Sequence, residues 1–413
     1  MLYNNQLQNQ QKGLDTNEKL HHNFDSRQQT ADSRQQTADS RQPITVNFFC
    51  TWSRDRKTSW SGIHYSLFTS LQQYANVIDI PLLDSFTARL ARKLKHIADK
   101  LTRSDNFMVF DSKIMQAEIE SSKLPAHDAP CIMFHAVPSR YMQNTYMYQD
   151  LTVDFVYRMW KEKSPLSRFT PLPPNTKESI VHERLELNRQ VNENCRGLLT
   201  MSQWLAKDLA VNTGIDARKI HHVGGGCNIN TSLIDTHGKN GKRFLFVGRD
   251  WERKNGPLAA EAFAKLHRKY PDAELYIAGP STAPQELDGI SGVNFLGLLS
   301  YDELVHYYNL CDFFVMPSRF EAYGIVFAEA LIFGLPCIGK DICAMPEFIQ
   351  DGKNGMLIHD DDPDELADCM ERLLLDRNNF VSYVEAMHDK YLTQYSWKSV
   401  AERIIDVMRQ DGF

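Results

Sequence analysis

The chain has 413 residues, of which 42% are hydrophobic and 24% are charged, and its formal net charge is −6. This composition is ordinary for a globular protein of two domains, and the negative charge argues against a dedicated nucleic-acid binder. No run reaches the ~18 apolar residues that a membrane span needs, and the Asn- and Gln-rich start lacks the apolar segment of a secretion signal.

Residues 1–42 are polar and contain a repeat of seven residues. The sequence Asp-Ser-Arg-Gln-Gln-Thr-Ala begins at Asp25 and at Asp32, and it starts again at Asp39. A period of seven is typical of coiled coils, but Ala is the only apolar residue in each repeat, so no helical core is expected. We therefore predict a disordered tail, with a flexible tether for a partner as the alternative.

Residues 43–228 predict an N-terminal α/β domain, in which short apolar runs alternate with segments of helical spacing. We expect strands at 45–50, 76–80, 106–110, 131–135, 197–201 and 219–223. The expected helices are 63–74, 86–101, 152–160, 177–192 and 203–212. Strands that alternate with helices favour a parallel, doubly wound sheet.

The predicted helix 86–101 has an apolar face and a basic flank. The apolar stripe consists of Phe86, Leu90, Leu94, Ile97 and Leu101. The basic flank consists of Arg89, Arg92, Lys93, Lys95, Lys100 and Arg103. We favour a packed helix with a solvated cationic face. The alternative is peripheral contact of 86–103 with an anionic membrane surface, at the inner face of the membrane.

Residues 229–395 predict a second α/β domain, entered through a polar linker from Asn228 to Lys242. We expect strands at 244–247, 274–278, 293–296, 313–316, 337–338 and 355–358, and helices at 258–269, 301–309, 325–333, 364–375 and 380–391. A last helix, 397–408 within 396–413, is a candidate for crossing back to the N-terminal domain. Two such sheets in series leave a cleft at the carboxyl ends of their strands, where ligands bind.

The segment from Ser318 to Glu329 carries the strongest functional signal. Gly324 lies at the start of a predicted helix, so the amides of Gly324, Ile325 and Val326 are expected to point at an anion such as a diphosphate. Glu329 is the only charged residue of that otherwise apolar helix, and such a carboxylate needs a partner, for which adjacent sugar hydroxyls are suitable. Together these features predict a nucleotide-sugar site.

Four segments of the second half resemble the retaining glycosyltransferases of family 4. They are Phe246-Val-Gly-Arg-Asp-Trp-Glu-Arg-Lys-Asn-Gly256, Glu321 to Glu329, Pro346-Glu-Phe-Ile-Gln-Asp-Gly-Lys-Asn-Gly355 and Tyr395-Ser-Trp397. The first half resembles the family more loosely, through residues 201–205 and 219–228. The resemblance implies the GT-B fold, which consists of two doubly wound Rossmann-like domains facing a cleft. It also implies transfer of a hexose-type sugar from a UDP- or GDP-linked donor.

The resemblance implies roles for the residues of the second half. Arg249 and Lys254 would grip the diphosphate and neutralise the charge that develops on the leaving nucleotide. Glu321 would face the hydroxyls of the donor sugar, and Glu329 would hold the ribose diol. Arg253, between the two cations, is expected to be solvated on the surface.

The roles in the first half are less defined by the resemblance. His135 would contact the sugar or the phosphate, with a satisfied core histidine as the alternative. Asp150 would orient an acceptor hydroxyl. Gly62 would let the backbone approach the phosphates, although the chain has Trp60-Ser61-Gly62 where the family often has paired glycines. Ser202 would border the cleft or cap a helix.

We expect no cofactor and no metal. The acids of residues 360–365 are interpreted as the N-terminal cap of a helix, and GT-B enzymes, as the resemblance implies, use amides and cations in place of a divalent ion. The eight cysteines form no CxxC pair, so reduced thiols in a cytoplasmic protein are expected.

The sequence leaves two alternative functions. One is a non-catalytic nucleotide-sugar-binding subunit, against which the combination of Arg249, Lys254, Glu321 and Glu329 argues. The other is a nucleotide-dependent oxidoreductase, but no G-x-G-x-x-G follows a predicted first strand. The acceptor stays open between a polysaccharide or other glycan, a glycolipid and a small molecule.

Overall fold

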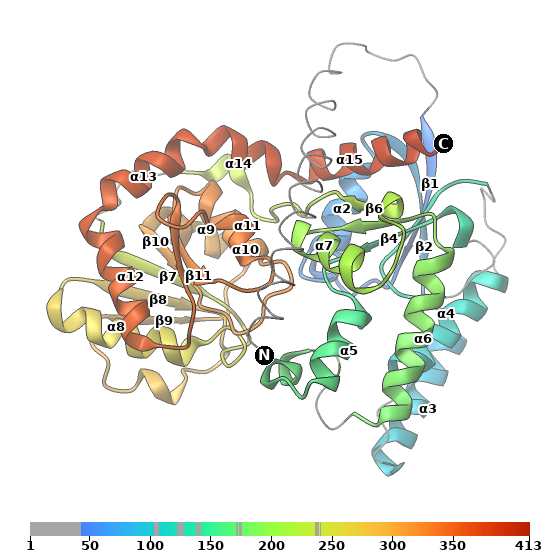
Figure 1. Cartoon of the computed structure of the whole chain (residues 1–413), viewed down its shortest axis with the longest axis horizontal. Coiled ribbons are helices and arrows are strands. Elements are labelled where there is room, and N and C mark those ends of the chain that lie inside the picture. The colour runs from blue at the N-terminus through green and yellow to red at the C-terminus, as the bar shows by residue number, and fades with distance from the viewer. Residues whose placement is uncertain are drawn as a thin grey trace, which may run out of the picture. The chain divides into compact units, whose positions relative to one another are not determined.

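In the computed structural model, the described residues are 43–102, 107–121, 128–137, 142–170, 172, 176–235, 239 and 241–413. The predicted tail, 1–42, lies outside them, and so does Arg103 of the predicted basic flank. Residues Ile44–Phe413 form one unit, which contains two six-stranded sheets with helices around them (Figure 1).

The first sheet is parallel throughout and has the order β2-β1-β3-β4-β5-β6. Its strands are β1 (Ile44–Cys50), β2 (Ala75–Pro81), β3 (Cys131–Met133), β4 (Thr145–Gln149), β5 (Gly197–Thr200) and β6 (Ile220–His222). In β1, consecutive residues Val46 to Cys50 are buried, because helices cover both faces of a parallel sheet.

Six α-helices belong to this half of the described chain. They are α2 (Ile63–Leu71), α3 (Phe86–Thr102), α4 (Phe107–Ser121), α5 (Val153–Lys161), α6 (Glu178–Asn194) and α7 (Gln203–Asn212). Thr152 caps α5, since its hydroxyl accepts a hydrogen bond from the amide of Phe155. These helices confirm most of the alternation expected from the sequence.

Two segments of this half differ from the expected strands. The apolar run 107–110, expected as part of a strand, is the first turn of α4. A run this short does not distinguish a strand from a helix, and the buried Met115 and Ile119 reveal the four-residue spacing only further along the chain. Strand β4 was not expected at all, because its sequence Thr-Tyr-Met-Tyr-Gln looks polar, although Tyr146 and Tyr148 are fully buried.

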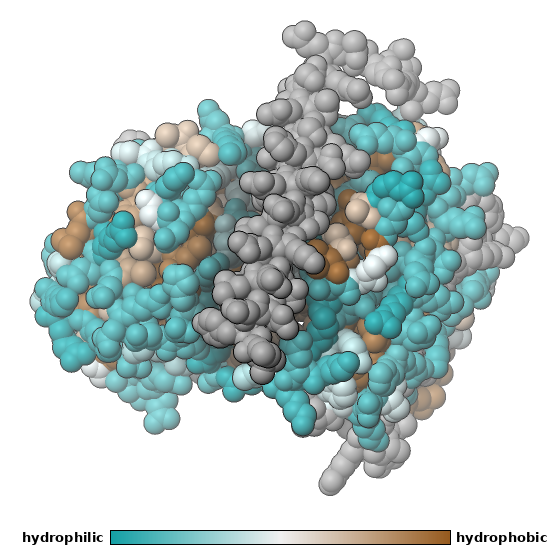
Figure 2. Space-filling view, in the orientation of Figure 1, coloured by the Kyte–Doolittle hydropathy of each residue, from teal (hydrophilic) through white to brown (hydrophobic). Residues whose placement is uncertain are grey.

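Helix α3 packs differently from the expectation. Its apolar stripe faces outward: Phe86 is 80% exposed and Leu94 is 59% exposed, whereas Ala88 is buried. On the packed side, the guanidinium of Arg92 donates to Asp111 of α4 at 3.0 Å. Figure 2 shows brown, apolar surface at the lower right, beside the place where Figure 1 labels α3. The expectation that the apolar stripe is the packed face is therefore wrong.

The second sheet is also parallel and has the order β12-β11-β10-β7-β8-β9. Its strands are β7 (Arg243–Val247), β8 (Glu274–Ala278), β9 (Val293–Gly297), β10 (Phe313–Val315), β11 (Cys337–Lys340) and β12 (Gly355–Ile358). The strand order reverses between β7 and β10, and ligands of doubly wound sheets bind at the carboxyl ends of the strands at such a point.

The helices of the second half follow the sequence pattern closely. They are α8 (Gly256–Lys269), α9 (Tyr301–Leu310), α10 (Ile325–Ile332), α11 (Met345–Phe348), α12 (Pro363–Leu375), α13 (Arg377–Ala386), α14 (His388–Gln394) and α15 (Trp397–Gln410). The expected single helix 380–391 is instead divided between α13 and α14 at Met387. Asp362 caps α12 and Pro363 is its first residue, as predicted.

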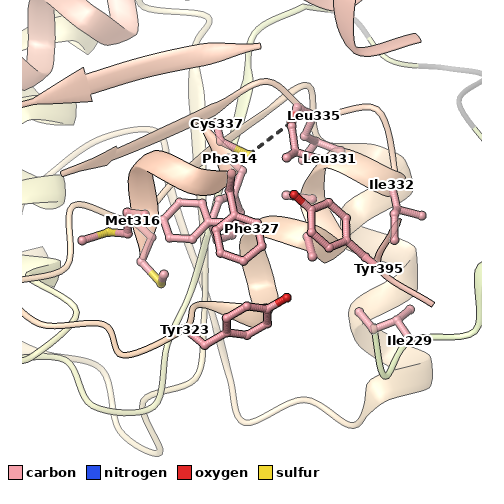
Figure 3. Packing of buried hydrophobic residues seen from close by; sticks show 14 of the residues in the cluster. Ile229, Phe314, Met316, Tyr323, Phe327, Leu331, Ile332, Leu335, Cys337 and Tyr395 are labelled. Atoms are coloured by element: carbon pink, nitrogen blue, oxygen red, sulfur yellow. Dashed lines mark hydrogen bonds between the residues drawn. The ribbon is translucent and has the colours of Figure 1, made fainter. Parts of the chain in front are cut away.

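Helix α10 is fixed on the sheet by aromatic packing. The rings of Phe314 on β10 and Phe327 on α10 meet edge to face with their centroids 5.3 Å apart. Figure 3 shows these rings side by side, with Tyr323 and Tyr395 nearby. This packing holds the first turn of α10 at the carboxyl edge of the sheet.

The last helix, α15, packs on α2 of the first half. The hydroxyl of Tyr74 donates to Glu402 at 2.7 Å, and the hydroxyl of Tyr146 donates to Asp411 at 2.6 Å. None of the helices in the described part of the chain combines the length and the apolar character of a membrane span.

Candidate functional site

The candidate site lies where the chain leaves β7 and β10, the two neighbouring strands at which the order of the second sheet reverses. The loop after β7 carries Arg249, Arg253 and Lys254, and the loop after β10 carries Glu321 and Gly324. Since carboxyl ends of parallel strands meet at one edge of a sheet, these loops are brought together by the topology.

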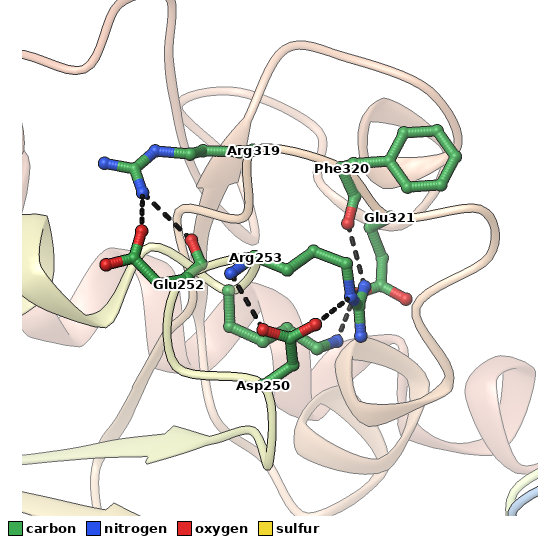
Figure 4. A network of polar contacts seen from close by, with 7 residues as sticks. Asp250, Glu252, Arg253, Arg319, Phe320 and Glu321 are labelled. Carbon is green, nitrogen blue, oxygen red and sulfur yellow. Dashed lines mark hydrogen bonds and ion pairs between the residues drawn. The ribbon is translucent and has the colours of Figure 1, made fainter. Parts of the chain in front are cut away.

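A carboxylate between two cations joins the loops. The ammonium of Lys254 donates to Glu321, and the guanidinium of Arg253 donates to the same carboxylate at 3.3 Å and to the carbonyl of Phe320 at 2.9 Å. Figure 4 shows Arg253 extended between Asp250 and Glu321. The side chain of Arg253 is only 24% exposed. The expectation of a solvated Arg253 is therefore wrong, because its partner Glu321 lies in a loop 68 residues further along the chain.

The charges of this cluster are set by burial and by each other. Burial alone raises the pKa of Glu321, but the neighbouring Lys254 and Arg253 outweigh it and lower that pKa. Burial lowers the pKa of Lys254, and its attraction to Glu321 opposes the change. Glu321 is therefore held as a carboxylate that orients the ammonium of Lys254.

Arg249 differs from Lys254 in its surroundings. Its side chain is exposed, and none of the described residues forms a hydrogen bond or an ion pair with it. Its charge nevertheless acts on Tyr301 of α9, whose pKa is raised by burial and by Glu329 and is lowered by Arg249. Arg249 is thus a cation without a carboxylate partner in the described part of the chain, and its charge acts near Tyr301.

The start of α10 presents amides, as the sequence predicts. Gly324 has a φ of +93° and precedes the first helical residue, so the chain turns sharply into the helix there. None of the described residues accepts a hydrogen bond from the N–H groups of Ile325 or Val326. Such amides at a helix start favour a negatively charged group.

Glu329 is buried in α10, at 2% exposure. The hydroxyl of Tyr308 donates to its carboxylate at 3.1 Å, and the backbone of Asn228 forms a further hydrogen bond. Burial raises the pKa of Glu329 to about 7, against the lowering effect of these two hydrogen bonds. The sequence indicates that Glu329 needs a partner, but it gives no sign of Tyr308 or Asn228.

The candidate His135 lies at the carboxyl edge of the first sheet. His135 follows β3, and its Nε2 lies 2.9 Å from the hydroxyl of Thr51, which follows the neighbouring strand β1. Burial lowers the pKa of His135. The imidazole of His64 on α2 is a further buried, neutral neighbour, with a pKa lowered to about 3 by burial and by His135.

Gly62 belongs to a turn of left-handed residues. The φ angles of Trp60, Ser61 and Gly62 are 45°, 55° and 88°. The carbonyl of Ser61 accepts hydrogen bonds from the Asn228 amide at 2.6 Å and from the Tyr301 hydroxyl at 2.8 Å. Ser61, which stands where the family often has a first glycine, therefore adopts the left-handed conformation that glycine favours. The two hydrogen bonds to its carbonyl hold this conformation.

Asp150 follows β4 and lies within electrostatic reach of the cluster around Glu321. The pKa of Asp150 is raised to about 6, mainly by burial and also by Glu321, while a backbone hydrogen bond and Arg253 lower it. A carboxyl group with such a pKa exchanges protons near neutral pH.

Two further side chains, those of Ser202 and Glu347, accept hydrogen bonds at the start of α7. Ser202 caps α7, since its hydroxyl accepts from the amide of Leu205 at 3.1 Å. Glu347 accepts hydrogen bonds from the amides of Gln203 and Trp204 at the same helix start, a contact that the sequence does not indicate. Among the described residues, no group of three or more His, Cys, Asp and Glu is arranged to hold a metal ion.

Comparison with known proteins bears on the second half. A family model described as "Glycosyl transferases group 1" matches residues 241–376. The chain is 30% identical over 173 residues to the GDP-mannose-dependent alpha-(1-6)-phosphatidylinositol monomannoside mannosyltransferase of Mycobacterium tuberculosis, covering 38% of this chain and 45% of that protein. The matched part thus spans less than half the length of this curated relative.

Solved structures resemble the chain over both halves. Sucrose-phosphate synthase from Thermosynechococcus elongatus aligns with a TM-score of 0.63 and 14% identity over 89% of this chain and 99% of that one. Anabaena HepE, solved in complex with UDP-glucose, aligns with a TM-score of 0.57 and 12% identity over 89% of this chain and 100% of that one. At such identities the likeness shows the fold. The chain therefore has the GT-B fold, and its residues 241–376 match the family model of the glycosyl transferases group 1.

Proposed function

We propose that the chain is a retaining glycosyltransferase, which moves a hexose-type sugar from a nucleoside diphosphate to an acceptor. The observation that carries the proposal is the convergence of Lys254 and Glu321 from the loops after β7 and β10, beside the amides that begin α10. Cations and amides that meet at a strand-order reversal suit a diphosphate. The match of residues 241–376 to the family model of the glycosyl transferases group 1 supports the same assignment.

In this proposal, each part of the donor has its own partners. The diphosphate binds to Arg249, Lys254 and the amides of Gly324, Ile325 and Val326. The ribose diol binds to Glu329, whose carboxylate also accepts hydrogen bonds from the Tyr308 hydroxyl and the Asn228 backbone. A GDP-mannose-dependent relative and a fold neighbour solved with UDP-glucose make guanosine and uridine the first bases to test.

The proposed transfer step uses the positive charges at the site to stabilise the leaving diphosphate. The acceptor hydroxyl attacks the anomeric carbon on the face that the diphosphate leaves, and the departing phosphate accepts the hydroxyl proton. Arg249 and Lys254 stabilise the charge that grows on the leaving diphosphate. Glu321 faces the donor sugar, Gly62 and His135 face the donor from the first half, and Asp150 orients the acceptor hydroxyl. Positioning and charge stabilisation supply the rate, without a metal or cofactor.

A thermal-shift titration tests the donor site. Uridine, guanosine and adenosine diphosphates are added to the full chain, and the corresponding nucleosides serve as controls without phosphate. We expect one diphosphate to raise the Tm and its nucleoside to have little effect, because ligands that bind only the folded state stabilise it. If none of the three diphosphates changes the Tm, the proposed donor site is wrong.

A turnover assay separates an enzyme from a non-catalytic binding subunit. The nucleotide sugar of the stabilising base is incubated with the protein and candidate acceptors, and free nucleoside diphosphate and the anomer of the product are followed by NMR. Release of the diphosphate with retention supports the proposal. Tight binding without release in the presence of any acceptor, or in water alone, would favour the binding subunit, and an inverted anomer would refute retention.

A further inference from the structure

Helix α3 presents an apolar stripe to the surface of the first half. Phe86, Leu90, Leu94 and Ile97 are 80%, 46%, 59% and 50% exposed. Among the described residues, no other α-helix has more than one large apolar side chain so exposed. Scattered single apolar residues are normal on a surface, whereas a contiguous stripe marks a contact with another body.

The apolar stripe is not the side by which α3 packs on the rest of the protein. At about 100° per residue, Ala88 lies opposite Phe86 and Leu90 on the helix. Ala88 is buried, and Arg92, one turn further along, is bonded to Asp111 of α4. The helix is thus attached to the protein by one side, and among the described residues its apolar side is exposed.

The charges beside the stripe point to the kind of partner. Lys93 is exposed among the apolar residues, the Arg89 side chain is 66% exposed while paired with Asp84, and His96 is exposed on the flank. The sequence of α3 has five basic residues and one acidic residue, in a chain whose net charge is −6. An apolar stripe with a basic flank is complementary to the acyl boundary and phosphates of an anionic lipid surface.

We propose that the outer face of α3 docks on an anionic membrane surface, with Phe86, Leu90, Leu94 and Ile97 in the headgroup boundary and Lys93 and Arg89 at the lipid phosphates. The contact is peripheral, because the helix lies along the surface with its other side attached to α4. This inference concerns a face apart from the proposed donor site, so it does not depend on the proposed function.

Vesicle flotation of the full chain tests the proposal. The protein is mixed with vesicles of phosphatidylcholine alone and with vesicles of equimolar phosphatidylcholine and phosphatidylglycerol, at low and at high salt. We expect binding to the anionic vesicles, weaker binding to the neutral ones, and loss of binding in high salt, since exposed charges are screened there.

Variants of the stripe separate it from other surfaces. The double substitution Leu90→Ser and Leu94→Ser is expected to lower the partition coefficient at least about ten-fold, because two apolar side chains no longer leave water. Lys93→Glu is expected to lower it by at least roughly five-fold. The matched control is Val211→Ser with Leu375→Ser, which makes the same kind of change at side chains 71% and 72% exposed on α7 and α12.

Several outcomes would overturn the proposal. These are equal binding by the wild type and the Leu90/Leu94 variant, equal loss in the control variant, or no binding of the wild type to anionic vesicles. A Leu90/Leu94 variant that becomes monomeric in sedimentation, from an oligomeric wild type and without vesicle binding in either, would assign the face to a second copy instead. An unchanged melting temperature and unchanged diphosphate-induced shift verify that the variants are folded.

Discussion

At the scale of single residues, the two proposed phosphate cations are predicted to respond differently to removal. Arg249 is exposed and has no partner among the described residues, so Arg249→Ala should change the free energy of unfolding by less than about 0.5 kcal/mol. Lys254 is 8% exposed and paired with Glu321, so Lys254→Ala should cost roughly 3 kcal/mol by leaving a buried carboxylate with one cation fewer. Both variants should lose at least about ten-fold in diphosphate affinity.

Urea unfolding and calorimetric titration with the stabilising diphosphate measure the two effects. Arg253→Lys is an informative companion, because it keeps a charge near Glu321 but removes the fork that also reaches Asp250 and Phe320. If Arg249→Ala binds the diphosphate as the wild type does, Arg249 is a surface cation and its assigned role is wrong.

The buried Glu329 predicts a pH dependence of stability. Its pKa is raised to about 7 in the folded protein, above the ordinary value of 4.5. The folded state therefore binds more protons, and the stabilisation is complete below pH 4.5 and lost as the pH rises through 7. The total change is about 3 kcal/mol. Wild-type stability should thus fall from pH 5 to pH 8 relative to Glu329→Gln, and parallel curves for both proteins would contradict the raised pKa.

The same carboxyl group predicts a pH dependence of donor binding with the opposite direction. If sugar hydroxyls donate to the ionised Glu329, affinity should increase from pH 6 to pH 8 and then level off. A nucleotide sugar is the suitable ligand, because its phosphodiesters do not titrate in this window. The dependence should disappear in Glu329→Gln, together with at least about ten-fold of the affinity at pH 8. An unchanged affinity of this variant would remove Glu329 from the site.

How far these residues were predictable depends on where their partners lie in the sequence. Glu321, Glu329, Lys254 and the start of α10 are recognisable because each stands in a local motif. Tyr308, which completes the surroundings of Glu329, has no local signal, because the contact exists only after α9 and α10 pack together. Arg253 likewise has no local signal of its burial, because Phe320 and Glu321 reach it from a distant loop.

At the scale of elements, the geometry at the start of α10 predicts that replacing Gly324 by alanine destabilises the fold. Its φ of +93° is unfavourable for a residue with a side chain, and an added Cβ would lie 3.0 Å from Phe327 and 3.1 Å from Glu321. Gly352 also has a positive φ, of +73°, but its Cβ would meet nothing within 4 Å. Gly352→Ala should therefore cost about 1 kcal/mol, and Gly324→Ala distinctly more. Melting temperatures measure the difference between the two variants. Equal losses of stability would show that Phe327 and Glu321 move aside for the added methyl group.

The accuracy with which each element is predicted depends on how clear its hydrophobic pattern is. In β8 and β12 the expected limits are the observed ones, since these strands are buried runs bordered by turn residues. In the first half, β4 was missed because tyrosines, whose hydroxyls are satisfied by distant groups, fill its core positions. The amphipathic pattern of α3 predicts a helix correctly, but a pattern alone does not say which side meets the protein.

At the scale of the whole molecule, helix α15 connects the two halves by contacts with the first half. Helix α15 follows the second half but packs on α2 of the first, and the indole of Trp397 donates to Asn228 at 2.8 Å. The amide of Gly225 donates to the hydroxyl of Tyr323 at 3.0 Å, and that hydroxyl donates back to the Gly225 carbonyl. Because these contacts join residues far apart in sequence, neither sheet is expected to lose its structure independently.

The resulting prediction concerns Ile404, which is fully buried in α15. Ile404→Ala should cost about 2–5 kcal/mol by leaving a cavity. In a single cooperative unit, that loss should lower the hydrogen-exchange protection of β1 and of β10 by similar amounts, although α15 packs on α2 of the first half. Lys398→Ala, an exposed position of the same helix, should leave both unchanged. If β1 loses protection while β10 keeps it, the sheets unfold separately, and α15 then stabilises the first half alone.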